Sequence, residues 1–209
     1  MERTLDTILN TGSKLRVIRL FTSRRKDFMA SGRQVARLVG LTPPAVHAAL
    51  KELYAQDILR RNIIGKQHIY RLNINNRTVK NILIPVFKTE NAVKKDIIAF
   101  LRKKIKEKKL ENKLISLLLY GSLQKGNSSK KSDVDIAVIL KEKTNKQSLE
   151  KVFIEDIASQ FYEYFGAHLD SYIKTKDEFM SRLKKNQAPV SALMQSYFVI
   201  YGKDPLSFK

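Results

Sequence analysis

Two apolar runs separated by a short polar loop constrain the fold more than any other feature of this sequence. Residues 114–120 read Leu-Ile-Ser-Leu-Leu-Leu-Tyr, and residues 134–140 read Val-Asp-Ile-Ala-Val-Ile-Leu. Runs of this kind are typical of strands that are buried on both faces and covered by helices. Apolar and polar residues alternate over 167–174, which predicts a third strand. We therefore predict an α/β (α+β) domain whose small mixed sheet is flanked by helices.

Small and acidic residues occupy the ends of these predicted strands. Gly121 and Ser122 follow the first run, and Asp133 and Asp135 open the second. A glycine and a serine leaving a buried strand can bring backbone amides and a hydroxyl close to phosphate oxygens. Residues i and i+2 of a strand share a face, so the two carboxylates converge, and Asp170 on the polar face of the third strand can join them. Carboxylates that repel one another favour a bound cation, and hard oxygen ligands suit Mg²⁺.

The interval between Gly121-Ser122 and Asp133-Val134-Asp135, set inside hydrophobic strands, resembles the signature of the DNA polymerase beta-like nucleotidyltransferase superfamily. It is most similar to the minimal nucleotidyltransferase branch, over roughly residues 90–205. Lys125 falls where minimal members often carry arginine, Gly126 matches the glycine that usually follows, and Ser132 matches the serine before the first aspartate.

The resemblance implies transfer of a nucleoside monophosphate from a triphosphate to an acceptor hydroxyl. It implies metal-ligand roles for Asp133 and Asp135, and a metal-ligand or general-base role for Asp170, with two Mg²⁺ ions when the triphosphate is bound. It implies nucleotide contacts for Gly121 and Ser122, and we add Lys125 and Ser132 as nucleotide-binding candidates. ATP is the first candidate donor. The acceptor stays open among a protein side chain, a small molecule and nucleic acid.

The first 76 residues predict a different module. Apolar spacing predicts a helix around Leu15 to Phe21, a short helix that stops at Gly40, and a third helix that begins after Thr42 with two prolines in its first turn. Two strand patterns then flank Gly65-Lys66. Three helices and a hairpin in this order predict a winged helix-turn-helix domain over 1–76, similar to bacterial and archaeal regulators, a connector over 77–89 and the nucleotidyltransferase domain over 90–209.

The charge distribution favours duplex DNA as the partner of this N-terminal module. The chain carries a net charge of +20, of which +9 falls in residues 1–76 and +8 in residues 77–113. Basic fields attract polyanions, and the third helix of a winged helix enters the major groove. The candidate DNA-binding residues lie on the predicted second and third helices and on the hairpin: Arg33, Arg37, Thr42, His47, Lys51, Arg60, Arg61 and Lys66. A winged helix can also serve dimerisation or protein contact, so a homodimer stays open.

Composition limits the kinds of metal site that the chain can form and argues against a membrane protein. There is no cysteine, which excludes disulfides and thiolate zinc sites, so any metal must be held mainly by oxygen. No apolar run is long enough for a membrane span, and the N-terminal residues do not resemble a signal peptide, so we expect a cytoplasmic protein without membrane contact.

Two helical patterns complete the expected C-terminal half. Apolar residues recur on one stripe from about residue 90 to 110, and residues 177–201 read as two helices broken near Pro189. The leading hypothesis is thus a magnesium-dependent nucleotidyltransferase attached to a DNA-binding winged helix. The alternative is a transcriptional regulator whose transferase-like domain senses a nucleotide or a partner protein without turnover.

Overall fold

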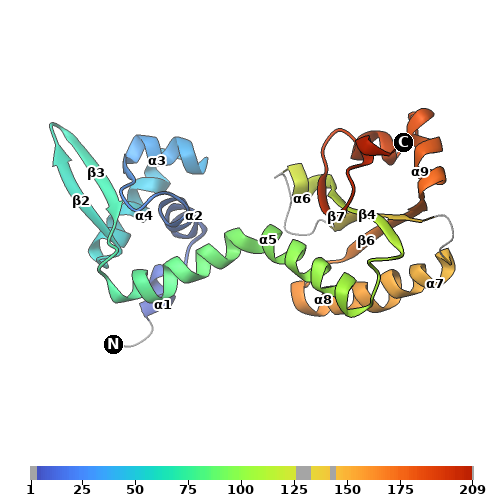
Figure 1. The fold of residues 1–209 in the computed structure, drawn as a ribbon. Coiled ribbons are helices and arrows are strands. Elements are labelled where there is room, and N and C mark those ends of the chain that lie inside the picture. The colour runs from blue at the N-terminus through green and yellow to red at the C-terminus, as the bar shows by residue number, and fades with distance from the viewer. Residues whose placement is uncertain (1–3, 126–132, 142–144, 209) are drawn as a thin grey trace. The chain divides into compact units, whose positions relative to one another are not determined.

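The computed structural model describes residues 4–125, 133–141 and 145–208, and the chain divides into two compact units, Met1–Val93 and Lys94–Lys209 (Figure 1). Each unit is described by itself below. No helix among the described residues is both long and apolar enough to cross a membrane.

The N-terminal unit contains a helical core and a three-stranded antiparallel sheet of order β1-β3-β2. Its elements are α1 (Thr4–Ile8), α2 (Gly12–Ser23), β1 (Met29–Ser31), α3 (Gly32–Val39), α4 (Pro43–Ala55), β2 (Leu59–Ile64) and β3 (Gln67–Leu72). Helices α2, α3 and α4 followed by the β2–β3 hairpin form the winged helix that the sequence predicts. Side chains buried on α2 and α4, such as Ile18 and Leu50, pack with Leu59 of the hairpin.

Local signals explain where these helices begin and end. Ser31 and Gln34 form a reciprocal capping box at the start of α3, and Gly40 ends that helix in the left-handed conformation at φ 65°. Pro43 and Pro44 occupy the first turn of α4, where their missing N–H groups cost little.

Most of the predicted connector, residues 77–89, is helical. A π-helical turn, η1 (Val79–Leu83), runs into α5 (Ile84–Glu107), which begins earlier than the sequence pattern suggests. Val79, Leu83 and Phe87 are buried in the core of the N-terminal unit. A helix places these three apolar side chains on one face, so their burial in the core favours a helix in this segment.

The C-terminal unit is a four-stranded mixed sheet with helices on both faces. The strands are β4 (Leu114–Tyr120), β5 (Val134–Leu140), β6 (Leu169–Thr175) and β7 (Phe198–Gly202), in the order β6-β5-β4-β7. Strands β5 and β6 are parallel, whereas β4 is antiparallel to both of its neighbours. The remaining elements are α6 (Gly121–Lys125), α7 (Lys146–Lys151), η2 (Val152–Ile157), α8 (Ala158–Phe165), α9 (Lys176–Lys184), α10 (Val190–Leu193) and η3 (Pro205–Ser207).

Two apolar layers cover this sheet. On one face, Ile97 and Leu101 of α5 and Phe161 of α8 pack with strand residues such as Ile136. On the other face, Phe179 of α9 and Leu193 of α10 pack with strand residues that alternate with the first set, such as Ala137. This second face is also the one that carries the candidate catalytic carboxylates.

The prediction of helix up to Tyr201 is wrong at its end. Residues 198–202 form β7, which pairs with β4 and completes the sheet. The segment is rich in aromatic and β-branched residues, which suit a pleated strand, and the exposed edge of β4 supplies the hydrogen bonds. Local apolar spacing did not reveal that edge.

Candidate active site and nucleic-acid interface

Strand register places three polar side chains in one row across the sheet. Tyr120 of β4 lies opposite Asp135 of β5, and Asp135 lies opposite Asp170 of β6. Register partners on adjacent strands point to the same face and have backbones about 5 Å apart. Asp135 and Asp170, on strands that are distant in sequence, are therefore immediate neighbours on one face of the sheet.

Asp133 stands at the entrance to β5 and contributes to the same electrostatic field. Burial raises the pKa of the Asp135 carboxyl, and the negative charges of Asp170 and Asp133 raise it further. Partial removal from water and like charges both disfavour the ionised form of a carboxyl group. The charges of the two other predicted aspartates thus both act on the Asp135 carboxyl.

Gly121 is fitted to the Asp135 carboxylate. A Cβ atom built on Gly121 would lie 1.9 Å from Oδ2 and 2.8 Å from Cγ of Asp135, and Gly121 has a φ of 78°. Both observations require glycine, since a side chain would collide and the backbone is left-handed. Gly121 therefore lets the turn from β4 into α6 close directly over the Asp135 carboxylate.

The remaining predicted nucleotide contacts are only partly described by the structure. Ser122 lies in the first turn of α6, directly after Gly121, and is half-buried. Lys125 is the last residue of α6, but its side chain lies outside the described part of the chain. Gly126 and Ser132 also lie outside the described residues.

The donor set fits a magnesium ion in its chemistry. Asp133, Asp135 and Asp170 supply carboxylate oxygens, the ligands that Mg²⁺ prefers. Burial, then repulsion from Asp170 and Asp133, raises the pKa of Asp135, and a bound cation would relieve that repulsion. Among the residues that the structure describes, however, no group of three acidic or histidine side chains is already arranged as a metal cage. Mg²⁺ commonly keeps several waters and uses substrate phosphates as further ligands, so a complete protein cage is not required.

Tyr120 is a member of the site to which the sequence assigned no role. Burial, then the charges of Asp135 and Asp170, raise the pKa of its phenol to about 12, with a smaller effect of Tyr172. The hydroxyl is thus protonated at neutral pH and can donate a hydrogen bond. Its place beside the carboxylates follows from its position as the last residue of β4, opposite Asp135.

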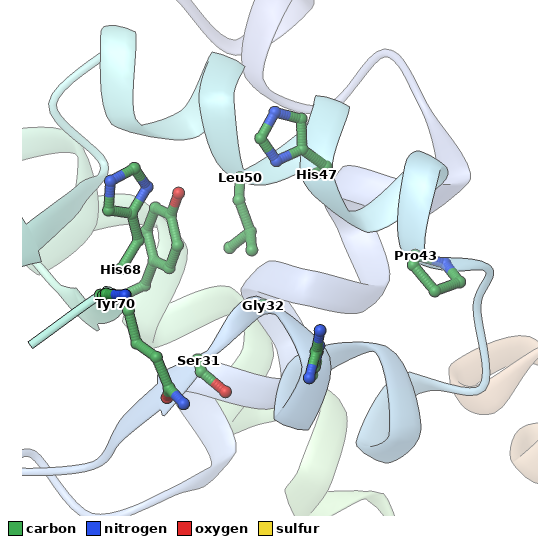
Figure 2. Close-up of a pocket in the computed structure, with 10 residues that line it drawn as sticks. Ser31, Gly32, Pro43, His47, Leu50, His68 and Tyr70 are labelled. Carbon is green, nitrogen blue, oxygen red and sulfur yellow. The ribbon is translucent and has the colours of Figure 1, made fainter.

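A groove lies between α4 and the β2–β3 hairpin, which is the wing of the winged helix (Figure 2). Its volume is about 520 Å³, and the residues that line it come from β1, α3, α4 and the wing: Ser31, Gly32, Arg33, Pro43, His47, Leu50, Lys66, Gln67, His68 and Tyr70. In Figure 2, His47 on α4 and His68 on β3 stand on opposite sides of this groove. No acidic residue is among the lining residues that the structure describes.

The structure places the predicted DNA-binding residues on several different surfaces of the N-terminal unit. Arg33, His47 and Lys66 meet in the α4–wing groove, whereas Arg37 lines a different cavity beside Met29. The guanidinium of Arg61 lies 4.5 Å from the ring centroid of Tyr54. Arg60 is the neighbour of Arg61 on β2, and because strand side chains alternate, it faces the other side of the hairpin.

The two other candidates are Thr42, directly before α4, and Lys51 within α4. Thr42 is the N-cap residue of that helix but makes no side-chain capping hydrogen bond, so its hydroxyl is not used by the helix. Lys51 is exposed.

Comparison with known protein families gives one match. Residues 103–193 match the family described as polymerase beta, nucleotidyltransferase. The matched range covers the row of Tyr120, Asp135 and Asp170, together with Gly121 and Asp133. This part of the chain is a polymerase beta-type nucleotidyltransferase domain.

Solved structures with similarity to the chain were also found, at low levels. A homodimeric winged helix-turn-helix DNA-binding domain from Mycobacterium bovis, described as a possible ArsR-family transcriptional regulator, is 16% identical with a TM-score of 0.35 and covers 43% of this chain and 77% of its own. HlyU from Vibrio cholerae is 15% identical with a TM-score of 0.36, and the match covers 43% of this chain and 97% of HlyU. A possible transcriptional regulator from Methanosarcina mazei is 21% identical with a TM-score of 0.32, and the match covers 50% of this chain and 84% of the regulator. A search of curated proteins gave no significant match.

Within the nucleotidyltransferase domain, the face that carries Asp170 continues along β6 to Tyr172 and Lys174. The hydroxyl of Tyr172 is buried and has no hydrogen-bond partner among the described residues. The ammonium of Lys174 lies 5.7 Å from the ring centroid of Tyr172. His168 instead stacks on Tyr162 at 4.8 Å between centroids, which gives this histidine a packing contact.

Proposed function

We propose that the protein is a magnesium-dependent nucleotidyltransferase that moves a nucleoside monophosphate from a nucleoside triphosphate, with ATP as the first candidate, to an acceptor hydroxyl. The observation that carries this proposal is the alignment of Asp135 with Asp170 across β5 and β6. Beside them lies Gly121, at a position that has no room for a side chain. The family match over residues 103–193 supports the reaction class.

In the proposed reaction, the acceptor oxygen attacks the α-phosphorus of the triphosphate. The bond between the α-phosphorus and its bridging oxygen to the β-phosphate breaks, and pyrophosphate leaves with the electron pair. Bound magnesium would supply charge neutralisation on the phosphates and lower the pKa of the attacking hydroxyl. Asp133 and Asp135 would hold the metal.

The remaining residues have separate roles in this proposal. Asp170 either completes the ligand set or accepts the proton of the acceptor hydroxyl. Gly121 and Ser122, together with the candidates Lys125 and Ser132, would contact the triphosphate. Tyr120, protonated at neutral pH, can donate a hydrogen bond to the carboxylates or to a phosphate oxygen.

The test is incubation of the purified protein with Mg²⁺ and each labelled nucleoside triphosphate, with and without added acceptors. The variant is Asp133→Ala/Asp135→Ala, and the matched control is Asp27→Ala, which removes an exposed carboxylate in the N-terminal unit. Transfer of label by the wild type and the control, and its loss in the double variant, is the expected result. Equal labelling by all three proteins would contradict the proposal.

We further propose that the N-terminal winged helix binds duplex DNA through the α4–wing groove. Three of the groove residues, Arg33, His47 and Lys66, carry donors from three different elements, and the described lining holds no carboxylate to repel phosphate. Phosphate contacts give affinity without reading sequence, and they release counterions. The affinity should therefore fall steeply with salt.

For DNA binding, Arg33→Gln/Lys66→Gln should weaken binding to any duplex sequence and reduce the slope of log K against log[salt] by about 2, roughly one for each phosphate contact. The control is Lys95→Gln/Lys106→Gln, which removes the same charge from exposed positions on α5. An unchanged slope in the groove variant would exclude the groove as the contact surface.

A second candidate function is a regulator that binds nucleotide without turnover. The observation that favours it is the winged helix in the same chain, whose α4–wing groove carries Arg33, His47 and Lys66. The labelling assay separates the two functions when it is combined with equilibrium binding. Metal-dependent binding of a triphosphate without transfer to any acceptor would support the regulator.

A further inference from the structure

The outer face of the wing carries a compact basic cavity that the DNA-binding groove does not include. The cavity has a volume of about 140 Å³, and its lining comes from the segment before β1, from the hairpin and from the turn after β3: Lys26, Arg60, Arg71, Leu72, Asn73, Ile74 and Asn75. This volume is well below the roughly 300 Å³ at which pockets for drug-sized ligands begin, so the cavity suits a small ion rather than a nucleotide.

Strand register brings two of these cations together. Arg60 of β2 and Arg71 of β3 are direct partners in the antiparallel pair, one step from the buried pair Leu59 and Leu72. Since strand side chains alternate, Arg60 and Arg71 both point away from the core, to the outer face. Like charges directly opposite one another destabilise a sheet, so this pairing costs free energy unless an anion lies between them.

The surroundings add positive charge and polar groups but no compensating acid. Lys26 reaches the same cavity from a different segment of the chain, and Asn73 and Asn75 add amide groups. No aspartate or glutamate lines the cavity among the described residues. The nearest acidic residue in sequence to Lys26 is Asp27, and its carboxylate forms an ion pair with Arg25 at 3.7 Å.

Neighbouring positions on the hairpin show that this arrangement is specific to the outer face. Arg61, one residue beyond Arg60, points to the opposite face and lies over the ring of Tyr54. Arg71 in the central strand has Met29 of β1 on one side and Arg60 on the other, so its only charged neighbour across the strands is another arginine. Arginine forks match the oxygens of phosphate in a bidentate manner.

We infer that Arg60, Arg71 and Lys26 form an oxyanion site for a phosphate group on the outer face of the wing, separate from the α4–wing groove. The phosphate can be a free ion or one phosphate of a nucleic-acid backbone. A two-stranded ribbon lying in a DNA groove would have phosphates on both sides, and this wing carries arginines on both faces. The inference does not depend on the transferase activity.

The test measures inorganic phosphate binding to the full chain by titration calorimetry, at constant ionic strength in chloride, and binding of a short duplex by fluorescence anisotropy. The variant is Arg60→Gln/Arg71→Gln. The control is Lys95→Gln/Lys106→Gln, which removes the same net charge from α5. Both arginines are exposed, so the variant should fold, and it should melt in chloride no lower than the wild type, because the repulsion between the two arginines is gone. Lys26→Gln provides a milder second variant.

We expect the arginine variant to weaken phosphate binding about tenfold or more, as befits the loss of charge-assisted hydrogen bonds, with a smaller loss for Lys26→Gln and a change below about twofold in the control. Weakened duplex binding without detectable binding of free phosphate would also support the site and would identify its phosphate as one of nucleic acid. If neither ligand distinguishes Arg60→Gln/Arg71→Gln and Lys26→Gln from the control, there is no oxyanion site.

Discussion

Gly121 and Asp135 show how a single pair of residues shapes the candidate active site. The carboxylate of Asp135 occupies the space where any other residue at position 121 would place its Cβ, 1.9 Å from Oδ2. The glycine is therefore needed for two separate reasons, its left-handed φ and the proximity of Asp135. These two reasons can be separated experimentally because the chain contains a glycine that has only the first.

Gly121→Ala should destabilise the protein more than Gly166→Ala. Gly166 ends α8 with a φ of 64° and has open space where a Cβ would lie, so its replacement costs only the left-handed strain of about 1–2 kcal/mol. Gly121→Ala adds the collision with Asp135. The measurement is the free energy of unfolding in denaturant.

A double-mutant cycle identifies the source of the extra cost. In the background of Asp135→Ala, the cost of Gly121→Ala should fall to about that of Gly166→Ala, because the colliding carboxylate is gone. Additive costs in this cycle would show that the collision is not the cause.

The raised pKa of Asp135 predicts a conflict between stability and activity. Because its pKa in the folded protein lies above the ordinary value, the native state disfavours the ionised carboxylate, and stability falls as pH rises through that folded pKa. In metal-free buffer, Asp135→Asn should therefore raise the free energy of unfolding at neutral pH. The gain should vanish in acid, below the ordinary aspartate pKa, where the wild-type carboxyl is protonated in both states.

The same substitution should lower nucleotide transfer by at least about 100-fold, the upper end of the loss measured for groups that only support metal ligands. Urea unfolding across the pH range and the labelling assay provide the two measurements. The control is Asp27→Asn, an exposed carboxylate that should give no gain in stability. A less stable Asp135→Asn at neutral pH would contradict the assigned repulsion.

At the scale of elements, helix caps differ in what their side chains contribute. Thr175 begins α9 with a capping box, in which its hydroxyl accepts from the Glu178 N–H and the Glu178 carboxylate accepts from the Thr175 N–H. Lys146 also donates to that carboxylate at 2.8 Å, and this contact is the largest cause of the lowered pKa of Glu178. Thr42 begins α4 without any side-chain capping bond.

Thr175→Ala should therefore cost about 1 kcal/mol of unfolding free energy, the usual value of an N-cap bond, whereas Thr42→Ala should cost much less. The two variants make the same chemical change at the same helix position, which makes each the control of the other. Thermal or denaturant unfolding measures the difference. Equal costs would show that the capping bond of α9 contributes nothing.

The last strand is the element that the sequence pattern missed. Residues 198–202 are short, and their apolar spacing is compatible with a helix end, so only pairing with β4 defines them as β7. Arg102 of α5 donates from Nε to the carbonyl of Ile200 at 2.8 Å. This contact occupies a carbonyl group of an edge strand, where unpaired backbone groups invite association with other chains.

At the scale of the whole molecule, the chain has separate hydrophobic cores. One core belongs to the N-terminal unit, and two lie on the opposite faces of the C-terminal sheet. Helix α5 contributes Phe87 to the first and Ile97 to one of the others. Separate cores allow a ligand to stabilise one unit without an equal effect on the other.

We therefore expect ligands to act on different unfolding transitions. Magnesium with a nucleoside triphosphate should raise the free energy of unfolding of the C-terminal unit. Duplex DNA should raise the free energy of unfolding of the N-terminal unit. At 100 times the dissociation constant, each would add about 2.7 kcal/mol. Hydrogen exchange resolved by segment measures both effects. Equal protection of both units by either ligand would show that they unfold as one.

The sequence by itself determined the strands β4 and β5, the winged helix and the motif that combines Gly121-Ser122 with Asp133 and Asp135. These features depend on local alternation, turn residues and spacing along one or two elements, all of which are present in the order of the residues. The same local rules predicted that Asp170 faces polar surroundings, but they did not identify the strand beside which it lies.

Only the tertiary structure showed which segments that are distant in sequence lie side by side. It placed Asp170 opposite Asp135 through parallel pairing of β5 with β6, brought Tyr120 into the same row, and turned residues 198–202 into a strand. It also placed Arg60 opposite Arg71 and separated Arg60 from the groove that holds Arg33. Register between strands is set by which faces are buried in the assembled core, so it depends on the whole domain rather than on any single segment.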